Sequence, residues 1–101
     1  MPSVADLVEQ PALEQMTGAD NFAAGQDLAD AGDVRLVEFG PLRIVAEVAD
    51  GGGAARVELA AIRDILEWSC DCAEGRAGVA CRHVAAAGIE TWRRAPVRRT
   101  P

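Results

Sequence analysis

The sequence predicts an α+β fold, in which short N-terminal helices, a small antiparallel sheet and a C-terminal helix form one cooperative domain. Apolar residues at helical spacing come first, and a region of strand-like alternation with turn signals follows them. All three cysteines and the only histidine lie close together beyond that region. We divide the 101 residues into an N-terminal helical segment 1–33, a small antiparallel sheet 34–67, a cysteine and histidine segment 68–92 and a basic, disordered tail 93–101.

The helical segment is predicted to begin with two short helices. Ser3 is a suitable N-cap, because its hydroxyl can accept a hydrogen bond from the first turn and Asp6 stands at the reciprocal position three residues later. Pro11 suits the first turn of the second helix, where no N–H is needed, and Gly18 is expected to end that helix.

A third helix is predicted over residues 21–31. Asn21 is its expected N-cap, and Gly32 is its expected stop, because glycine readily adopts the left-handed conformation that ends many helices. Phe22 and Leu28 are expected to lie on one side of this helix.

The sheet is predicted from strand-like runs at residues 34–39, 42–48, 55–59 and 67–72. The second run is the clearest, because its polar residues Arg43 and Glu47 fit the two-residue period of a strand. Gly40-Pro41 marks a turn, and the glycines after Asp50 form a hairpin connection. Residues 60–66 are ambiguous, because their isoleucines and leucine also fit a short turn of helix.

Four candidate metal ligands occur in the order Cys-x-Cys, eight residues, Cys-x-His, and they are Cys70, Cys72, Cys81 and His83. Three thiols and one imidazole form the ligand set of a closed, tetrahedral zinc site. Residues two apart on a strand point to the same side, so the first pair suits the end of the last strand. The second pair suits the start of a helix, with the cysteine just before it and the histidine in its first turn.

The loop 73–80 contains Gly75 and Gly78, which are expected to let the chain double back so that the ligands converge. Arg76 and Arg82 are close to the ligands in sequence and are interpreted as charges that stabilise the thiolates. The last helix is predicted to run from about residue 82 to residue 94. Its Trp92, like Trp68 before the first cysteine, is interpreted as a core side chain rather than a base-stacking one.

This arrangement of ligands resembles the SWIM zinc finger, in which Cys-x-Cys is followed by a variable loop and by Cys-x-His at the start of a helix. The alanine-rich run after His83 is similar to the small-residue helix of that family. Two departures are Ala73, where the family often has proline, and Arg82, where lysine is commoner; neither replaces a ligand. The metal-binding core of the resemblance covers about a quarter of the chain.

A second stretch is similar to the region Phe-x-Arg-Gly-x-x-Tyr-x-x-x-Gly-x-Val that often precedes the finger in bacterial SWIM-containing proteins. The matching positions are Phe22, Gly25, Leu28, Gly32 and Val34. Ala24 stands where arginine is usual, and Leu28 stands where tyrosine is usual. With this stretch, the resemblance extends over about four-fifths of the chain.

Three other interpretations of the cysteines fit the sequence less well. A disulfide would leave an odd cysteine, and the first residues do not resemble a secretory signal, so we expect the thiols to be reduced. An iron–sulfur cluster of the CDGSH type also uses three cysteines and one histidine, but it places the histidine four positions after the last cysteine, whereas Cys81 and His83 are two apart. Ordinary burial of the four residues would require their clustering to be a coincidence.

Composition and charge limit the classes of protein to which the chain can belong. Residues 1–50 carry ten acidic residues and two arginines, a net charge of −8, whereas residues 51–101 carry six acidic residues and eight arginines, a net charge of +2. Alanine and glycine supply much of the apolar content, so the side chains bury little area and the core is thin. We therefore expect metal binding to supply much of the folding free energy, and the metal-free C-terminal half to be largely unfolded. No run of eighteen apolar residues occurs, and we expect a soluble, cytoplasmic protein that does not enter a membrane.

The sequence predicts a binding module rather than an enzyme that acts on a small molecule. There is no second histidine, the thiols are committed to metal, and a four-ligand zinc site has no open coordination position for substrate. SWIM fingers occur in and beside Swi/Snf-type helicases, transposases, recombination mediators and ubiquitin ligases. The resemblance therefore implies a structural zinc and a protein partner in a nucleic-acid-processing machine.

Direct binding of DNA or RNA is the alternative function. It would use the basic side chains of the C-terminal half, which are Arg76, Arg82, Arg93, Arg94, Arg98 and Arg99. The acidic N-terminal half would repel phosphates, and the chain has no lysine. We therefore favour a protein-interaction role.

Overall fold

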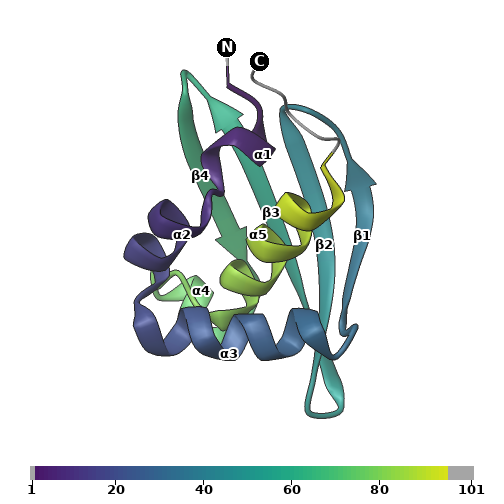
Figure 1. The fold of residues 1–101 in the computed structure, drawn as a ribbon. Helices are drawn as coiled ribbons and strands as arrows, with labels where there is room; N and C mark the ends of the chain where they lie inside the picture. The colour runs from purple at the N-terminus through teal and green to yellow at the C-terminus, as the bar shows by residue number, and fades with distance from the viewer. Residues whose placement is uncertain (1, 96–101) are drawn as a thin grey trace.

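The computed structural model describes residues 2–95 and has the predicted α+β architecture (Figure 1). In chain order the elements are α1 (Val4–Leu7), α2 (Gln10–Thr17), α3 (Ala19–Asp30), β1 (Val34–Phe39), β2 (Arg43–Asp50), β3 (Gly53–Ile62), β4 (Ile65–Cys70), α4 (Ala73–Arg76) and α5 (Arg82–Arg94). The helix α5 includes the first two residues of the predicted tail, and residues 96–101 of that tail lie outside the described part of the chain.

The four strands form one antiparallel sheet in the order β1-β2-β3-β4, with each strand paired to its neighbour in sequence. The register places Ile44 opposite Leu59 and Ala46 opposite Val57, so the apolar residues of the central strands share one face. The helices cover that face (Figure 1). The helix α5 lies along the sheet, and α3 runs across the lower end of the view, where it packs mainly on α5.

The helix α5 is the centre of the core. It contacts all four strands as well as α1, α2 and α3, and its residues from His83 to Ile89 are all buried. Most of these residues are small, which lets the backbones of two helices approach closely. A Cβ atom added to Gly25 of α3 would lie 2.6 Å from the Cβ of Ala85 in α5. The alanine-rich composition is therefore a requirement of close helix packing.

The opposite face of the sheet carries ion pairs. Arg43 contacts Glu38 of β1 and Glu58 of β3 at 3.5 and 3.0 Å, and Arg56 contacts Glu58 at 3.4 Å. Val45 lies between Glu38 and Glu58 in the register and is almost completely buried by them and their partners. Apart from Val45, this face of the central strands is exposed or only partly buried.

The structure corrects two predicted element boundaries. Residues 60–66 form no helical turn: β3 continues to Ile62, and a turn at Arg63 and Asp64, with φ of 54° and 67°, leads directly into β4. The helix α3 begins at Ala19 after Gly18, so Asn21 is not its N-cap. The Asn21 amide instead donates hydrogen bonds to the carbonyls of Thr17 and Ala80.

The capping prediction for the first helix is confirmed, because Ser3 and Asp6 form the reciprocal hydrogen bonds of a capping box. The prediction that Trp92 is a core side chain is wrong. Trp92 is 39% exposed, at the edge of a groove that it lines with Leu13 and Phe22. Trp68 is half-buried and packs against the core cluster. Among residues 2–95, the longest helix has 13 residues, too few to cross a bilayer.

Candidate metal centre

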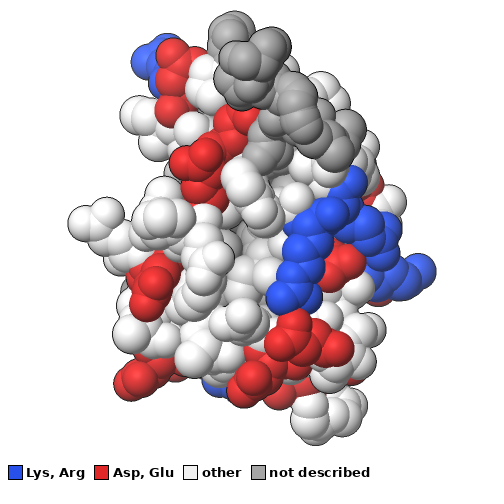
Figure 2. All heavy atoms as spheres, in the orientation of Figure 1, with Lys and Arg blue, Asp and Glu red and all other residues white. Residues whose placement is uncertain are grey.

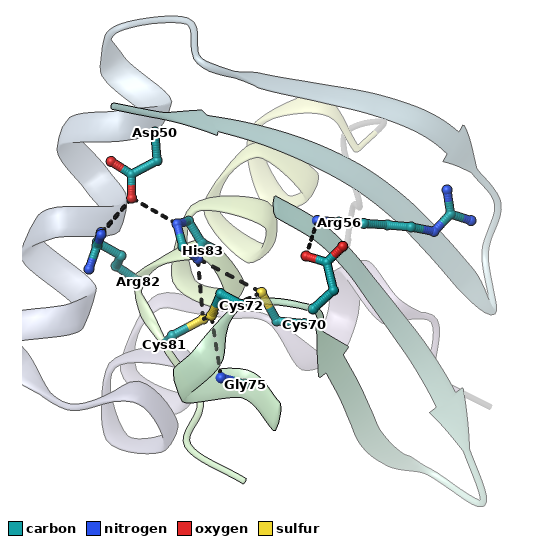
Figure 3. Close-up of polar contacts among 9 residues, drawn as sticks. Asp50, Arg56, Cys70, Cys72, Gly75, Cys81, Arg82 and His83 are labelled. Atoms are coloured by element: carbon teal, nitrogen blue, oxygen red, sulfur yellow. Dashed lines mark hydrogen bonds and ion pairs between the residues drawn. The ribbon is translucent and has the colours of Figure 1, made fainter. Parts of the chain in front are cut away.

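The four predicted ligands come together from the end of the sheet and the start of α5 (Figure 3). Cys70 is the last residue of β4, and Cys72 is the N-cap of α4. Cys81 is the N-cap of α5, and His83 lies in the first turn of that helix. Cys81 and His83 lie at the start of a helix, as the spacing predicts, whereas the last strand ends at Cys70, so Cys72 lies beyond the strand that was predicted to carry both cysteines.

The distances between the ligand atoms are short and similar. The sulfurs of Cys70 and Cys72 are 3.5 Å apart, as are those of Cys72 and Cys81. The Nδ1 atom of His83 lies 3.8 Å from the sulfur of Cys70 and 3.6 Å from that of Cys81. All four ligand atoms lie within 4.8 Å of one another, and the cysteines form no disulfide. This cluster, Cys70, Cys72, Cys81 and His83, can hold one metal ion.

The loop between Cys72 and Cys81 is more ordered than predicted, because its first residues form the short helix α4. The backbone N–H of Gly75 donates a hydrogen bond to the Cys72 sulfur at 3.3 Å. Asp71, between the first two ligands, accepts a hydrogen bond from the backbone N–H of Arg56 at 2.9 Å, and this ties the Cys-x-Cys segment to β3. Local backbone contacts therefore hold the first ligand pair in place.

The three thiols have different pKa values because their surroundings differ. Burial raises the pKa of Cys70 and of Cys81 above the ordinary value of a thiol. Burial also acts to raise the pKa of Cys72, but hydrogen bonds from the Gly75 N–H, from His83 and from the other thiols outweigh it and lower the pKa to about 7. Cys72 is therefore the thiol that most readily supplies the thiolate form in which cysteine binds metals.

Sequence reasoning missed a carboxylate beside the cluster. The Nε2 atom of His83, on the side of the ring away from the sulfurs, lies 2.8 Å from Oδ2 of Asp50. Arg82 donates to the same oxygen through Nε at 2.8 Å and also contacts it through a terminal nitrogen at 2.6 Å. Hydrogen bonds from His83 and then from Arg82 hold the pKa of Asp50 below its ordinary value. No motif links this residue, 33 positions earlier, to the histidine.

Of the six arginines predicted to contact nucleic acid, four lie in the described part of the chain, and three of these form ion pairs. Arg82 pairs with Asp50, Arg93 with Asp30 at 2.7 Å, and Arg94 with Glu90 at 2.9 Å. On the face shown in Figure 2, arginine side chains accordingly lie beside acidic ones. Arg76 is exposed at the end of α4 and forms no ion pair with the described residues. Arg98 and Arg99 lie outside the described residues.

No protein-family model, curated protein or solved structure matches this chain. Its capacity to bind a metal therefore follows from the identity and positions of the four side chains themselves. Membership of the SWIM family stays a prediction that rests on their spacing and on the helix that follows them.

Proposed function

We propose that the chain is a SWIM-type zinc module, in which Cys70, Cys72, Cys81 and His83 bind one structural Zn²⁺. We further propose that the module is a protein-interaction domain associated with a nucleic-acid-processing machine of the helicase, transposase or recombination type. The observation that carries this proposal is the convergence of four ligand atoms within 4.8 Å of one another. The resemblance to SWIM fingers supplies the class of partner.

The distances support zinc as the ion. Zinc–sulfur bonds of about 2.3 Å and zinc–nitrogen bonds of about 2.0–2.1 Å in a tetrahedron place two sulfurs about 3.8 Å apart, and a sulfur and a nitrogen about 3.6 Å apart. In the cluster, two sulfur pairs are 3.5 Å apart, two sulfur–nitrogen pairs are 3.6 and 3.8 Å apart, and all four ligand atoms lie within 4.8 Å of one another. Such a tetrahedron surrounds a single ion. A two-iron cluster would divide the four ligands between two metal atoms, so this spacing favours zinc over iron and sulfide.

The burial and position of the ligands support a structural role. Cys70, Cys81 and His83 are buried, and Cys72 is half-buried. Four protein ligands complete the coordination of a tetrahedral zinc, which leaves no position for a substrate or a water nucleophile. The ion would join the end of β4 to the start of α5, and its binding would therefore stabilise the contact between sheet and core helix.

The surface favours a protein partner over a nucleic acid. Several large apolar side chains are about half exposed at the end of the sheet where the β1–β2 and β3–β4 turns lie: Phe39, Leu42, Ile62 and Ile65. The two turns adjoin, since the Ala61 N–H donates to the carbonyl of Leu42. Exposed apolar side chains that gather in one place are typical of protein-interaction surfaces. The arginines available to phosphates are fewer than the sequence indicates, because three of them are ion-paired.

Elemental analysis of the purified protein, together with its absorption spectrum, tests the proposed metal. We expect about one zinc per chain in a colourless protein, and loss of that zinc in His83→Ala and Cys72→Ala. Glu74→Gln is a suitable control, because Glu74 is exposed in α4 and contributes no ligand. Iron with visible absorption, or a His83→Ala protein that keeps zinc at full affinity, would contradict the ligand assignment.

Two binding measurements separate the candidate partners. A short DNA or RNA duplex at low salt should not bind the zinc-loaded domain if the protein-interaction role is correct. A partner protein captured by the wild type should be lost with Ile65→Asp, a change at the exposed apolar end of the sheet that leaves the metal ligands intact. Binding of the duplex that disappears when residues 93–101 are deleted would instead support the nucleic-acid function.

A further inference from the structure

The carboxylate of Asp50 lies on the far side of the His83 ring from the cysteines. The Nδ1 atom of His83 faces the sulfurs of Cys70 and Cys81, whereas Nε2 faces Oδ2 of Asp50 at 2.8 Å (Figure 3). A neutral imidazole carries its proton on one nitrogen and a lone pair on the other. A hydrogen bond to a carboxylate, which only accepts, requires the proton to be on Nε2, and this leaves the Nδ1 lone pair directed at the cluster.

The geometry points to Asp50 as the positioning residue of the metal centre: its carboxylate holds the Nε2–H of His83, so that Nδ1 is presented as the fourth ligand. This inference rests on the proposed function, since it concerns the same metal site. Asp50 is not itself a ligand, because the imidazole ring stands between its carboxylate and the sulfurs. Carboxylates in this position orient metal-binding histidines and raise their basicity.

Asp50 is itself held from two directions. It is the last residue of β2 and pairs with Gly53 across a tight turn, whose Gly51 and Gly52 have φ of 61° and 92°. Two positive φ angles in succession strongly favour glycine, so the Gly-Gly sequence fixes how the strand end is presented. Arg82 then donates to Oδ2 from α5. Since Arg82 and His83 are adjacent in α5, a single carboxylate connects the β2–β3 hairpin to the helix that carries two ligands.

The other carboxylate near the cluster has a different role. Asp71 lies between Cys70 and Cys72 in sequence, but its Oδ1 accepts the backbone N–H of Arg56. It therefore anchors the Cys-x-Cys segment to the neighbouring strand. Of the carboxylates in the described residues, Asp50 is the one that contacts a ring nitrogen of His83.

Zinc affinity of Asp50→Ala and Asp50→Asn, measured by competition with a chromophoric chelator, tests this inference. We expect Asp50→Ala to weaken zinc binding by about 10- to 100-fold, the usual effect of removing such a partner. Asp50→Asn should weaken it less, because the amide oxygen can still accept the Nε2–H. Glu74→Gln, which removes a carboxylate from α4 that forms no hydrogen bond with His83, should bind zinc like the wild type.

Nitrogen-15 NMR of the imidazole provides a second readout, and His83 is the only histidine, so its signals need no assignment among others. The zinc-loaded wild type should be protonated at Nε2 and metal-bound at Nδ1, and the Nε2–H should exchange with solvent faster in Asp50→Asn. Wild-type ligation through Nε2 would overturn the inference even if Asp50→Ala failed to fold. Unchanged affinity and exchange in both variants would also overturn it, while leaving the zinc site intact. A wild type that binds no zinc would overturn the proposed function, and this inference with it.

Discussion

Gly75 occupies a position in α4 that has no room for a side chain. A Cβ atom there would come within 2.4 Å of the carbonyl oxygen of Cys70 and 2.7 Å of its Cβ. The sequence predicts that Gly75 and Gly78 help the chain to double back, and the two do so by different means. Gly78 adopts a positive φ of 88°, whereas Gly75 permits close contact with the backbone of a metal ligand.

We expect Gly75→Ala to lower the free energy of unfolding of the metal-loaded protein by about 1–3 kcal/mol, the usual cost of overpacking. The obstructing atoms belong to the backbone of Cys70 and cannot rotate away, so the ligand itself must move. Denaturant unfolding measures the change. Gly53→Ala is the matched control, because no atom lies within 4 Å of a Cβ at that position. Equal stability of the two variants would contradict the close contact at Cys70.

The ligands could be predicted from sequence, but their supporting residue could not. Cys70, Cys72, Cys81 and His83 carry rare chemistry at a short and regular spacing, and the second pair lies at the start of a helix, as the spacing indicates. Asp50 is one of sixteen acidic residues, and only the fold brings it to His83. Its one local signal, the glycines that follow it, indicates a turn and says nothing about a metal.

The helices α3 and α5 are packed closely where they cross. A Cβ at Gly25 would meet the backbone nitrogen of Ala86 at 2.7 Å and the carbonyl oxygen of Arg82 at 2.9 Å. The atoms nearest to a Cβ at Gly88, on α5, are side-chain atoms of Leu13, at 2.7, 2.9 and 3.4 Å. Both glycines lie inside helices, where alanine is intrinsically favoured by about 1 kcal/mol.

These surroundings predict opposite outcomes for the same substitution. Gly25→Ala should destabilise the protein by about 1–3 kcal/mol, because backbone atoms obstruct the new methyl group. Gly88→Ala should be close to neutral, because Leu13 can rearrange and the helix propensity of alanine offsets the remaining cost. Thermal unfolding of the two variants beside the wild type measures the difference. A Gly25→Ala protein at least as stable as Gly88→Ala would contradict the packing of α3 on α5.

The charged face of the sheet contributes a pH-dependent stability. Hydrogen bonds from Arg43 and then from Arg56 hold the pKa of Glu58 below its ordinary value of 4.5. A carboxyl whose pKa is lower in the folded state stabilises the fold above its unfolded pKa, and this contribution is lost as the pH falls through the folded pKa.

Glu58→Gln should therefore be less stable than the wild type at neutral pH, by at most about 1 kcal/mol because solvent screens partly exposed pairs. The difference should begin to shrink as the pH falls below the ordinary pKa of 4.5, and it should disappear only below the lowered pKa of the folded state. Urea unfolding of both proteins across this range measures it. If Glu58→Gln were less stable than the wild type by the same amount in acid, the substitution would have removed packing contacts rather than a charged hydrogen bond.

The second strand and the first helix cap were easier to predict than the ends of some other elements. The second strand alternates clearly, and Ser3 with Asp6 forms the predicted capping box. The segment 60–66 has helical spacing, yet pairing with the rest of the sheet extends β3 and β4 through it. Trp92 has the size and apolar character of a core residue, but its side chain lines a groove at the surface and is 39% exposed.

The whole molecule depends on α5, which contacts every strand and the three N-terminal helices. A site that fixes the start of this helix therefore affects more than the C-terminal half of the chain. Structural zinc sites contribute on the order of 10 kcal/mol to folding, comparable to the total stability of a small domain.

We accordingly expect removal of zinc by a chelator to unfold the sheet and the helices together. Circular dichroism in the far ultraviolet, followed during titration with the chelator, measures the loss of structure, and added zinc should restore it. The chelator saturated with zinc beforehand is the control. A metal-free protein that keeps its native spectrum and cooperative melting would show that the packing of α5 suffices without the ion.

The late position of α5 in the chain affects how the protein is made. The ribosome synthesises α1 to α3 and the four strands before α5, so Ile44, Val57 and Leu59 lack the one helix that contacts every strand until residues 82–94 emerge. Cys81 and His83 emerge at the same stage, so neither the core nor the metal site can be completed earlier. We therefore expect metal loading in the cell to follow translation of the strands, and the uncovered sheet to need protection from aggregation in the interval.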